Sequence, residues 1–188
     1  MQLIKIDTNE FEKNLYSKYE EIFPSNERKP LGHIKNLYNK GFLEIIEILD
    51  EEKIVGFFIT NILPQNPYVL LDFFAIFPEQ QSKGYGSKAI ILLKELYKNH
   101  EGIYIEVEMP DKLEQDINKQ RRIKFYEKLG FYNLGYELKL FNVAFSTFIL
   151  PINETKHSNK DIINKIKEIY IAVLGKENYT KNCILAEN

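Results

Sequence analysis

Two glycines, Gly84 and Gly86, stand one residue apart and follow three polar side chains, Gln81, Ser82 and Lys83. Because glycine has no Cβ, the backbone there can adopt left-handed dihedral angles and approach a ligand closely. The polar residues add an amide donor, a hydroxyl group and a cation. A helix that begins at about Gly86 would point its free N–H groups at the same place, which favours an anion such as phosphate. The spacing therefore predicts a phosphate-binding loop.

Two common nucleotide-binding loops are excluded by the residues around Gly86. A Walker-type loop needs Gly-x-x-x-x-Gly-Lys-Ser/Thr, whereas Gly86 is followed by Ser87 and then Lys88. A dinucleotide-binding loop needs a third glycine at position 89, where this chain has Ala89, and a strand near the start of the chain. The loop therefore belongs to another class of phosphate site.

The loop is expected to lie between a strand and a helix. Residues 69–77, VLLDFFAIF, form a continuous apolar run that is typical of a buried strand, and Pro78 follows it. The residues after Gly86 predict an amphipathic helix whose apolar face consists of Ile90, Ile91, Leu93, Leu96 and Tyr97.

Two motifs in this region resemble the GNAT superfamily of N-acetyltransferases. Gln81-x-x-Gly84-x-Gly86, after a strand that ends in Phe74-Ala75-Ile76, is similar to the superfamily's acyl-CoA pyrophosphate loop. Residues 121–131, RRIKFYEKLGF, are similar to the later helix that ends in Tyr-Glu-Lys-x-Gly-Phe. The resemblance covers about residues 1–150. It implies an acetyl-CoA-dependent N-acetyltransferase.

The resemblance also implies where acetyl-CoA, the acetyl donor, binds. The main chain of Phe74, Ala75 and Ile76 would pair with the pantetheine arm in the manner of an added strand. Family members often carry an asparagine seven residues before the helix tyrosine, where this chain has Lys119 and, one place earlier, Asn118. The remaining cofactor contacts are expected from Gln81, Ser82, Lys83, Gly84, Tyr85, Gly86, Ser87 and Asn118.

Glu106 is the candidate general base. An amine attacks a thioester only when unprotonated, and a lysine-type amine with a pKa of about 10.4 is almost wholly protonated near neutrality, so another group must take the proton. Residues 102–109, GIYIEVEM, predict a strand with Glu106 and Glu108 on its polar face. In the resembling acetyltransferases that modify ribosomal-protein N-termini, a Leu-Glu-Val strand supplies the base, and Ile105-Glu106-Val107 matches it. Glu108 and Asp72 are the alternative bases, and a solvated glutamate without a catalytic role is the other interpretation of Glu106.

Tyr126 is the candidate general acid. The departing thiolate needs a proton or a hydrogen bond, which a tyrosine with a reference pKa of about 10 can give. Tyr126 matches the superfamily tyrosine that plays this part. By spacing alone, Ile123, Tyr126 and Leu129 form a stripe, so a core aromatic residue is the alternative. A backbone N–H near Ile76 is expected to stabilise the charge on the carbonyl oxygen.

Composition narrows the class of protein. The 188 residues, 44% of them hydrophobic and 28% charged, suit one compact domain. A net charge of -2 and a pI near 6.0 predict no nucleic-acid partner.

No apolar run approaches the roughly 18 residues of a membrane span, and the start of the chain does not look like a signal peptide. Cys183 is the only cysteine, which fits a reducing cytoplasm. The three histidines, His33, His100 and His157, are scattered, so no metal site is expected.

The complete chain predicts a mixed α/β fold. Residues 50–53, DEEK, form a polar turn between two strands that would pair antiparallel. The element order β-α-α-β-β-β-α-β-α-β-β predicts a GNAT-like central mixed, twisted sheet of six to seven strands flanked by helices, splayed between the fourth and fifth strands at 69–77 and 102–109. The other expected strands are 2–7, 42–49, 54–63, 136–140 and 143–150, and the other expected helices are 9–23, 34–39 and 121–129.

The C-terminal part extends beyond the resemblance. We expect a GNAT-like N-acetyltransferase domain at 1–151 and an amphipathic helical extension at 152–188, in which residues 176–188 are frayed. The apolar face of the extension is expected to pack on the same domain, and packing on a second copy in a homodimer is the alternative. That face consists of Ile162, Ile163, Ile166, Ile169, Tyr170 and Val173.

The sequence thus predicts a cytoplasmic enzyme that transfers an acetyl group from acetyl-CoA to a primary amine of a small molecule or peptide by direct attack. The alternatives are an acyl-CoA sensor without catalysis and a protein N-terminal or lysine acetyltransferase. A sensor needs neither Glu106 nor Tyr126, so their presence favours an enzyme. Candidates for contact with the acceptor are Phe23, Glu27, Arg28 and His33.

Overall fold

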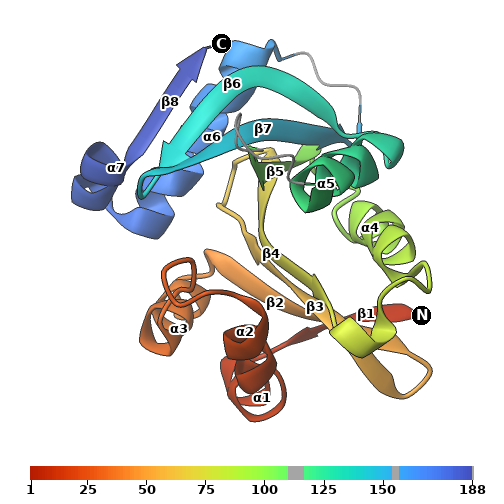
Figure 1. The fold of residues 1–188 in the computed structure, drawn as a ribbon. Helices are drawn as coiled ribbons and strands as arrows, with labels where there is room; N and C mark the ends of the chain where they lie inside the picture. The colour runs from red at the N-terminus through yellow and green to blue at the C-terminus, as the bar shows by residue number, and fades with distance from the viewer. Residues whose placement is uncertain (110–116, 154–156, 188) are drawn as a thin grey trace. The chain divides into compact units, whose positions relative to one another are not determined.

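The structure is a computed structural model that describes residues 1–109, 117–153 and 157–187 (Figure 1). The chain forms two compact units: unit 1 consists of Met1–Pro64 and Leu71–Leu96, and unit 2 of Gln65–Leu70 and Tyr97–Asn188. The division falls within strand β4 (Tyr68–Ile76), which contributes to both. The strands have the hydrogen-bonded order β1-β2-β3-β4-β5-β7-β6-β8, so the prediction of a mixed α/β fold with a mixed sheet is confirmed.

Unit 1 is built on antiparallel strands with helices on both sides. Figure 1 shows α1, α2 and α3 on one side of the unit 1 strands and α4 on the other. The predicted polar turn joins β2 to β3, and Glu51 in this turn has a φ of 55°. The strands are β1 (Gln2–Ile6), β2 (Leu43–Asp50), β3 (Lys53–Asn61) and the part of β4 from Leu71 onwards. The helices are α1 (Thr8–Asn14), α2 (Tyr16–Ile22), α3 (Leu31–Asn39), the 3-10 turn η1 (Pro78–Gln80) and α4 (Tyr85–Leu96).

Aromatic side chains form much of the unit 1 core. Phe11 and Tyr19 are fully buried and meet Phe57 and Phe73 of the sheet edge to face, with 5.0 Å between the ring centroids of Tyr19 and Phe73. The prediction of one helix over 9–23 is wrong, because Leu15 leaves the helical region with φ -124° and ψ -22°. The break lets both short helices turn an aromatic face towards the sheet.

Unit 2 continues from the start of β4. Tyr68, Val69 and Leu70 pair in parallel with the first three residues of β5, and every further pairing in this unit is antiparallel. The strands are β5 (Gly102–Glu108), β6 (Tyr132–Leu140), β7 (Val143–Pro151) and β8 (Cys183–Glu187). The helices are α5 (Ile117–Lys128), α6 (Asn159–Leu174) and α7 (Lys176–Asn182).

The prediction of a frayed end is wrong for residues 176–187. They form α7 and β8, and β8 pairs with β6, for example Leu138 with Leu185. Among the described residues, the sheet accordingly has eight strands and not six to seven. β8 has only five residues, and Ile184 among them is 60% exposed, so its sequence shows little hydrophobic alternation. Pairing with the edge of β6, and not the sequence of β8 itself, therefore determines that this segment is a strand.

Strand β6 begins earlier than residue 136, where we expected it. Gly135 has a φ of 77° and donates its backbone N–H to the side chain of Asn133 at 2.7 Å, and the register with β7 shifts between Asn133 and Glu137. Asparagine and glycine are typical of turns, so a bulge that contains them looks like a turn in the sequence although it lies inside a strand.

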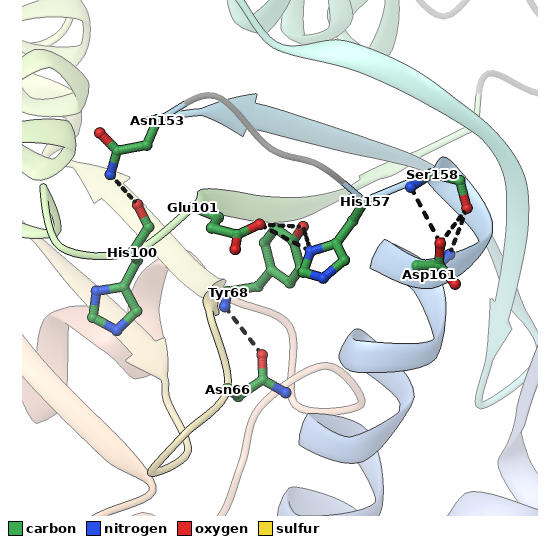
Figure 2. A network of polar contacts seen from close by, with 8 residues as sticks. All are labelled: Asn66, Tyr68, His100, Glu101, Asn153, His157, Ser158 and Asp161. Atoms are coloured by element: carbon green, nitrogen blue, oxygen red, sulfur yellow. Dashed lines mark hydrogen bonds and ion pairs between the residues drawn. The ribbon is translucent and has the colours of Figure 1, made fainter.

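Polar contacts fix the start of α6 to the strands of unit 2 (Figure 2). Glu101, just before β5, accepts hydrogen bonds from the Tyr68 hydroxyl at 3.1 Å and lies 2.9 Å from Nδ1 of His157. Ser158 and Asp161 then form the capping box that begins the helix.

The apolar face of α6 is buried as predicted, so this face packs on its own chain. All six residues of that face lie within the buried core, and Asn66 of the same unit donates to the Lys165 carbonyl at 2.8 Å. In the part of the chain that the structure describes, no helix is both long and apolar enough to cross a membrane.

Candidate functional site

The predicted phosphate loop connects β4 to α4 in unit 1. Ser82 and Gly84 both have left-handed φ values, 63° and 79°, and α4 begins at the next residue, Tyr85. Turns of this kind direct backbone N–H groups towards an anion. Gly86 lies in the first turn of α4, close to the predicted start of the helix. The prediction is wrong in one respect: the two residues with left-handed φ values are Ser82 and Gly84, and not Gly84 and Gly86.

Side chains of the loop hold its own conformation. Gln81 donates its side-chain N–H to the carbonyl of Ile76 at 3.0 Å, and the ammonium of Lys83 lies 3.0 Å from both the Glu79 carbonyl oxygen and the Gln80 side-chain oxygen. Tyr85 donates its hydroxyl to Asp50 at 2.7 Å, and this hydrogen bond raises the pKa of the phenol. These contacts stabilise the conformation of the loop and of the residue that follows it.

The stretch Phe74–Ile76 is held tightly against β3. A Cβ atom on Gly56 would lie 2.2 Å from the carbonyl oxygen of Ala75, closer than atoms can approach. The Phe74 ring stacks on Phe58 with 4.6 Å between centroids. The main chain predicted to bind pantetheine is thus positioned by a glycine and a phenylalanine, Gly56 and Phe58, of the neighbouring strand β3.

Glu106 lies on β5 in unit 2 and is partly exposed. Its carboxylate accepts a hydrogen bond from the hydroxyl of Tyr170 on α6, and the Tyr104 hydroxyl lies 3.4 Å from that of Tyr170. Burial and the nearby charge of Glu106 raise the pKa of both phenols well above the usual value. Both phenols therefore stay protonated near neutral pH, and Tyr170 can donate to the Glu106 carboxylate.

The alternative bases are engaged by cations. The ammonium of Lys119 lies 2.7 Å from the Glu108 carboxylate in unit 2, and that of Lys29 lies 2.5 Å from Asp72 in unit 1. Glu106 accepts a hydrogen bond from the neutral phenol of Tyr170.

Cys183, at the start of β8, lies close enough to Glu106 to feel its charge. Burial, together with that charge, raises the pKa of the thiol to about 12. Since the thiolate and not the thiol is the nucleophile, the one cysteine of the chain is inert near neutral pH.

Tyr126 lies on α5 in unit 2 with its side chain 9% exposed. Its ring meets those of Phe125 and Phe131 edge to face, each with 5.2 Å between centroids. Burial raises the pKa of the phenol to about 12, and the positive charge of Arg122 offsets part of this effect. The phenol therefore remains a donor through the whole neutral range.

The predicted site residues fall into two sets. Unit 1 contains those from Phe74 to Ser87, and unit 2 contains Glu106, Asn118 and Tyr126. Asn118 lies in the exposed first turn of α5, and the residues 110–116 before it are outside the described residues. Two contacts were not predicted from the sequence: the one between Tyr170 and Glu106, and the one between Lys29 and Asp72.

A pocket of about 540 Å³ lies in unit 1 but contains none of the predicted site residues. It is lined by Lys5, Ile6, Asp7, Tyr38, Gly41, Leu43, Glu44, Ile45 and Ile62. Within the described ranges, no three or more His, Cys, Asp or Glu side chains are grouped so that they could hold a metal ion.

Comparisons with known proteins agree with this construction. No curated protein matches the chain. Among solved structures, a protein of the GNAT family from Bacteroides thetaiotaomicron has a TM-score of 0.75 at 22% identity, over 92% of this chain and 98% of that one. A spermidine N-acetyltransferase from Vibrio cholerae, in complex with CoA and spermine, has a TM-score of 0.58 at 15% identity, over 80% and 94% of the two chains.

A third structure, the ribosomal-protein-S18-alanine N-acetyltransferase from Escherichia coli, has a TM-score of 0.59 at 15% identity, over 83% of this chain and 96% of that one. At these identities the likeness is one of fold. The sequence itself matches the Acetyltransferase (GNAT) family over residues 9–131, about two thirds of the chain. The protein therefore belongs to the GNAT family of acetyltransferases.

Proposed function

We propose that this protein transfers the acetyl group of acetyl-CoA to a primary amine of a small molecule or peptide by direct attack. Glu106 acts as the general base, and Tyr126 takes the place of the general acid by donating a hydrogen bond to the departing sulfur. Membership of the GNAT family supports the reaction class. Acetyl-CoA would supply a thioester carbonyl as the electrophile. The protein's own residues would bind and orient the two substrates and would move protons.

The geometry of the β4–α4 loop is the observation that carries this proposal. Two left-handed residues, Ser82 and Gly84, lead directly into the first turn of a helix of 12 residues. Backbone N–H groups of residues 82–87 suit a pyrophosphate, and the main chain of Phe74–Ile76 suits the amides of a pantetheine arm.

Direct attack is favoured because the residues that the structure describes include no thiolate that could act as an acyl-enzyme nucleophile. A two-step route would need an activated group such as a thiolate. Cys183 is 7% exposed and its pKa of about 12 keeps it protonated, so it is a poor candidate. The acceptor amine itself is then the nucleophile, and it must lose a proton to a base.

Glu106 would take that proton, and α6 would keep its carboxylate in place. The Tyr170 hydroxyl donates to Glu106 from the C-terminal extension, beyond the residues that match the family. We propose that residues 1–151 form the acetyltransferase domain and that the extension 152–188 completes it by orienting the base.

Tyr126 would donate a hydrogen bond to the departing sulfur. Its pKa of about 12 lies well above that of a thiol, about 8.5, so complete proton transfer to the thiolate is uphill and the hydrogen bond is the main contribution. Hydrogen bonds to charged groups contribute roughly 1.5 to 3 kcal/mol.

The loop is tested by replacing Gly86 with glutamate. Like charges about 4 Å apart repel by roughly 1 to 4 kcal/mol, so we expect the Kd of acetyl-CoA, measured by calorimetry, to rise at least about fivefold. Gly32→Glu is the matched control, because position 32 lies in a helix of unit 1 where an added Cβ has no atom within 4 Å. Unchanged affinity in a folded Gly86→Glu variant would refute the loop as the binding site.

Tyr126→Phe is expected to lower kcat by roughly 10- to 100-fold at every pH from about 7 to about 10. The donor is the protonated phenol, and because its pKa is raised to about 12, it does not lose the proton in this range. The wild-type rate should therefore show no fall near pH 10 that the variant lacks. A variant that keeps the wild-type kcat would make Tyr126 a core aromatic residue only.

A further inference from the structure

A lysine ammonium in unit 1 contacts both a carboxylate and an aromatic ring. The Nζ atom of Lys29 lies 2.5 Å from a carboxylate oxygen of Asp72 and 5.0 Å from the centroid of the Phe73 ring. The side-chain amide of Asn61 donates to the same Asp72 oxygen at 2.7 Å. A carboxylate and an aromatic face are the groups that recognise an ammonium ion in proteins.

The surroundings keep this arrangement in place without Lys29. Phe73 meets Tyr19 and Phe23 edge to face, at 5.0 and 4.9 Å between centroids, so the aromatic wall belongs to the core of unit 1. Asp72 and Asn61 are fixed on β4 and β3. Lys29 instead belongs to the irregular segment between α2 and α3, where its backbone N–H donates to the Tyr19 hydroxyl at 2.7 Å.

The site has unused hydrogen-bonding capacity. Asn61 is fully buried, and its side-chain oxygen has no hydrogen-bond partner among the described residues. A buried carbonyl oxygen without a partner is costly, and an ammonium ion with three N–H donors could satisfy both Asn61 and Asp72. The side chains of Lys29 and Asp72 remain 17% and 15% exposed, so the site is reachable from solvent.

We propose that Asp72, Asn61 and Phe73 form a binding site for a primary ammonium group of the acceptor, and that Lys29 occupies this site until the acceptor displaces it. The inference rests on the proposed function for its link to acetyl transfer. The binding site itself rests only on the contacts within unit 1.

The position of Asp72 along β4 suits this role. Asp72 is partly exposed, as are Phe74 and Ile76 further along β4. Asp72 precedes Phe74 by two residues, about 7 Å along the strand. An ammonium bound at Asp72 therefore lies next to the stretch proposed to hold the pantetheine arm.

The chemistry of the site also narrows the acceptor class. An amine must be neutral to attack the thioester, whereas the contact with Asp72 stabilises the charged form. The group held at Asp72 is thus a second ammonium that does not react. The preferred acceptors are diamines and other compounds with an amino group at each end of an alkyl chain.

Calorimetry with 1,4-diaminobutane and no acetyl-CoA tests the site. Lys29→Met keeps the aliphatic stem and removes the competing charge, so the Kd should fall by about tenfold or more if Lys29 occupies the site nine-tenths of the time. Lys29→Met with Asp72→Asn should lose this gain completely. Lys35→Met is the control, because Lys35 forms an exposed ion pair with Glu12 at 2.5 Å in the same unit, and its Kd should match the wild type.

Equal Kd values for Lys29→Met and the wild type, or a gain that survives Asp72→Asn, would overturn the proposal. Circular dichroism of each variant shows whether it is folded. A separate assay of CoA release compares 1,4-diaminobutane with 1-aminobutane, and a higher kcat/KM for the monoamine would overturn the second-ammonium argument. Diamine binding that depends on Asp72, without any CoA release, would refute the proposed function and leave the site standing.

Discussion

Glu106→Gln should lower kcat by roughly 10²- to 10⁴-fold, the range assigned to general base catalysis. Glutamine keeps the shape of the side chain and can still accept the hydrogen bond of Tyr170, but it has no basicity. Steady-state kinetics with a saturating amine measure this loss. The Kd of acetyl-CoA should stay unchanged, since its proposed contacts come from residues 74–87.

Glu108→Gln is the matched control for that result. Glu108 lies two residues along the same face of β5 but is paired with Lys119 at 2.7 Å, so its loss should change kcat by no more than a few-fold. If the two variants lose activity equally, or if Glu106→Gln keeps the wild-type rate, Glu106 is not the base.

Deletion of residues 152–188 is expected to prevent unit 2 from folding. The truncation removes the six buried residues on one face of α6 and the strand β8 that covers the edge of β6. Full burial of such a side chain contributes about 1.5 to 3 kcal/mol, so the loss is on the order of 10 kcal/mol, comparable with the whole stability of a typical domain.

Thermal denaturation followed by circular dichroism, together with binding of an apolar dye, measures the effect of the truncation. A shorter deletion, of residues 183–188 only, is the control and should lower the melting temperature by a smaller amount, because β8 has a single buried residue, Cys183. A truncated protein that melts like the full chain, or a dimer that becomes a folded monomer, would contradict packing of α6 on its own chain.

Local patterns in the sequence predicted the elements of the fold well. The apolar run of β4, the glycines after it and the periodicity of α4 each determine structure within about ten residues, and the structure has all three in order. The face of α6 was predictable for the same reason. The helix break at Leu15 and the strand β8 were not predictable, because tertiary contacts and not local sequence preference determine them.

Contacts between distant residues could not be predicted in this way. Tyr170 and Glu106 are 64 residues apart, and Lys29 and Asp72 are 43 apart. Tyr170 fits an apolar helix face by spacing, and only its hydroxyl indicated that it needs a polar partner. The residues that surround the candidate base and the ammonium site could therefore be identified only from the fold.

Because Cys183 is buried, the folded protein should not react with thiol reagents. With a thiol pKa of about 12 and 7% exposure, the side chain should react only when β8 detaches from β6. In an assay that detects released CoA by its sulfhydryl group, the folded enzyme then adds no background signal. The same reagent, used without substrate, turns Cys183 into a probe of how often the last strand opens.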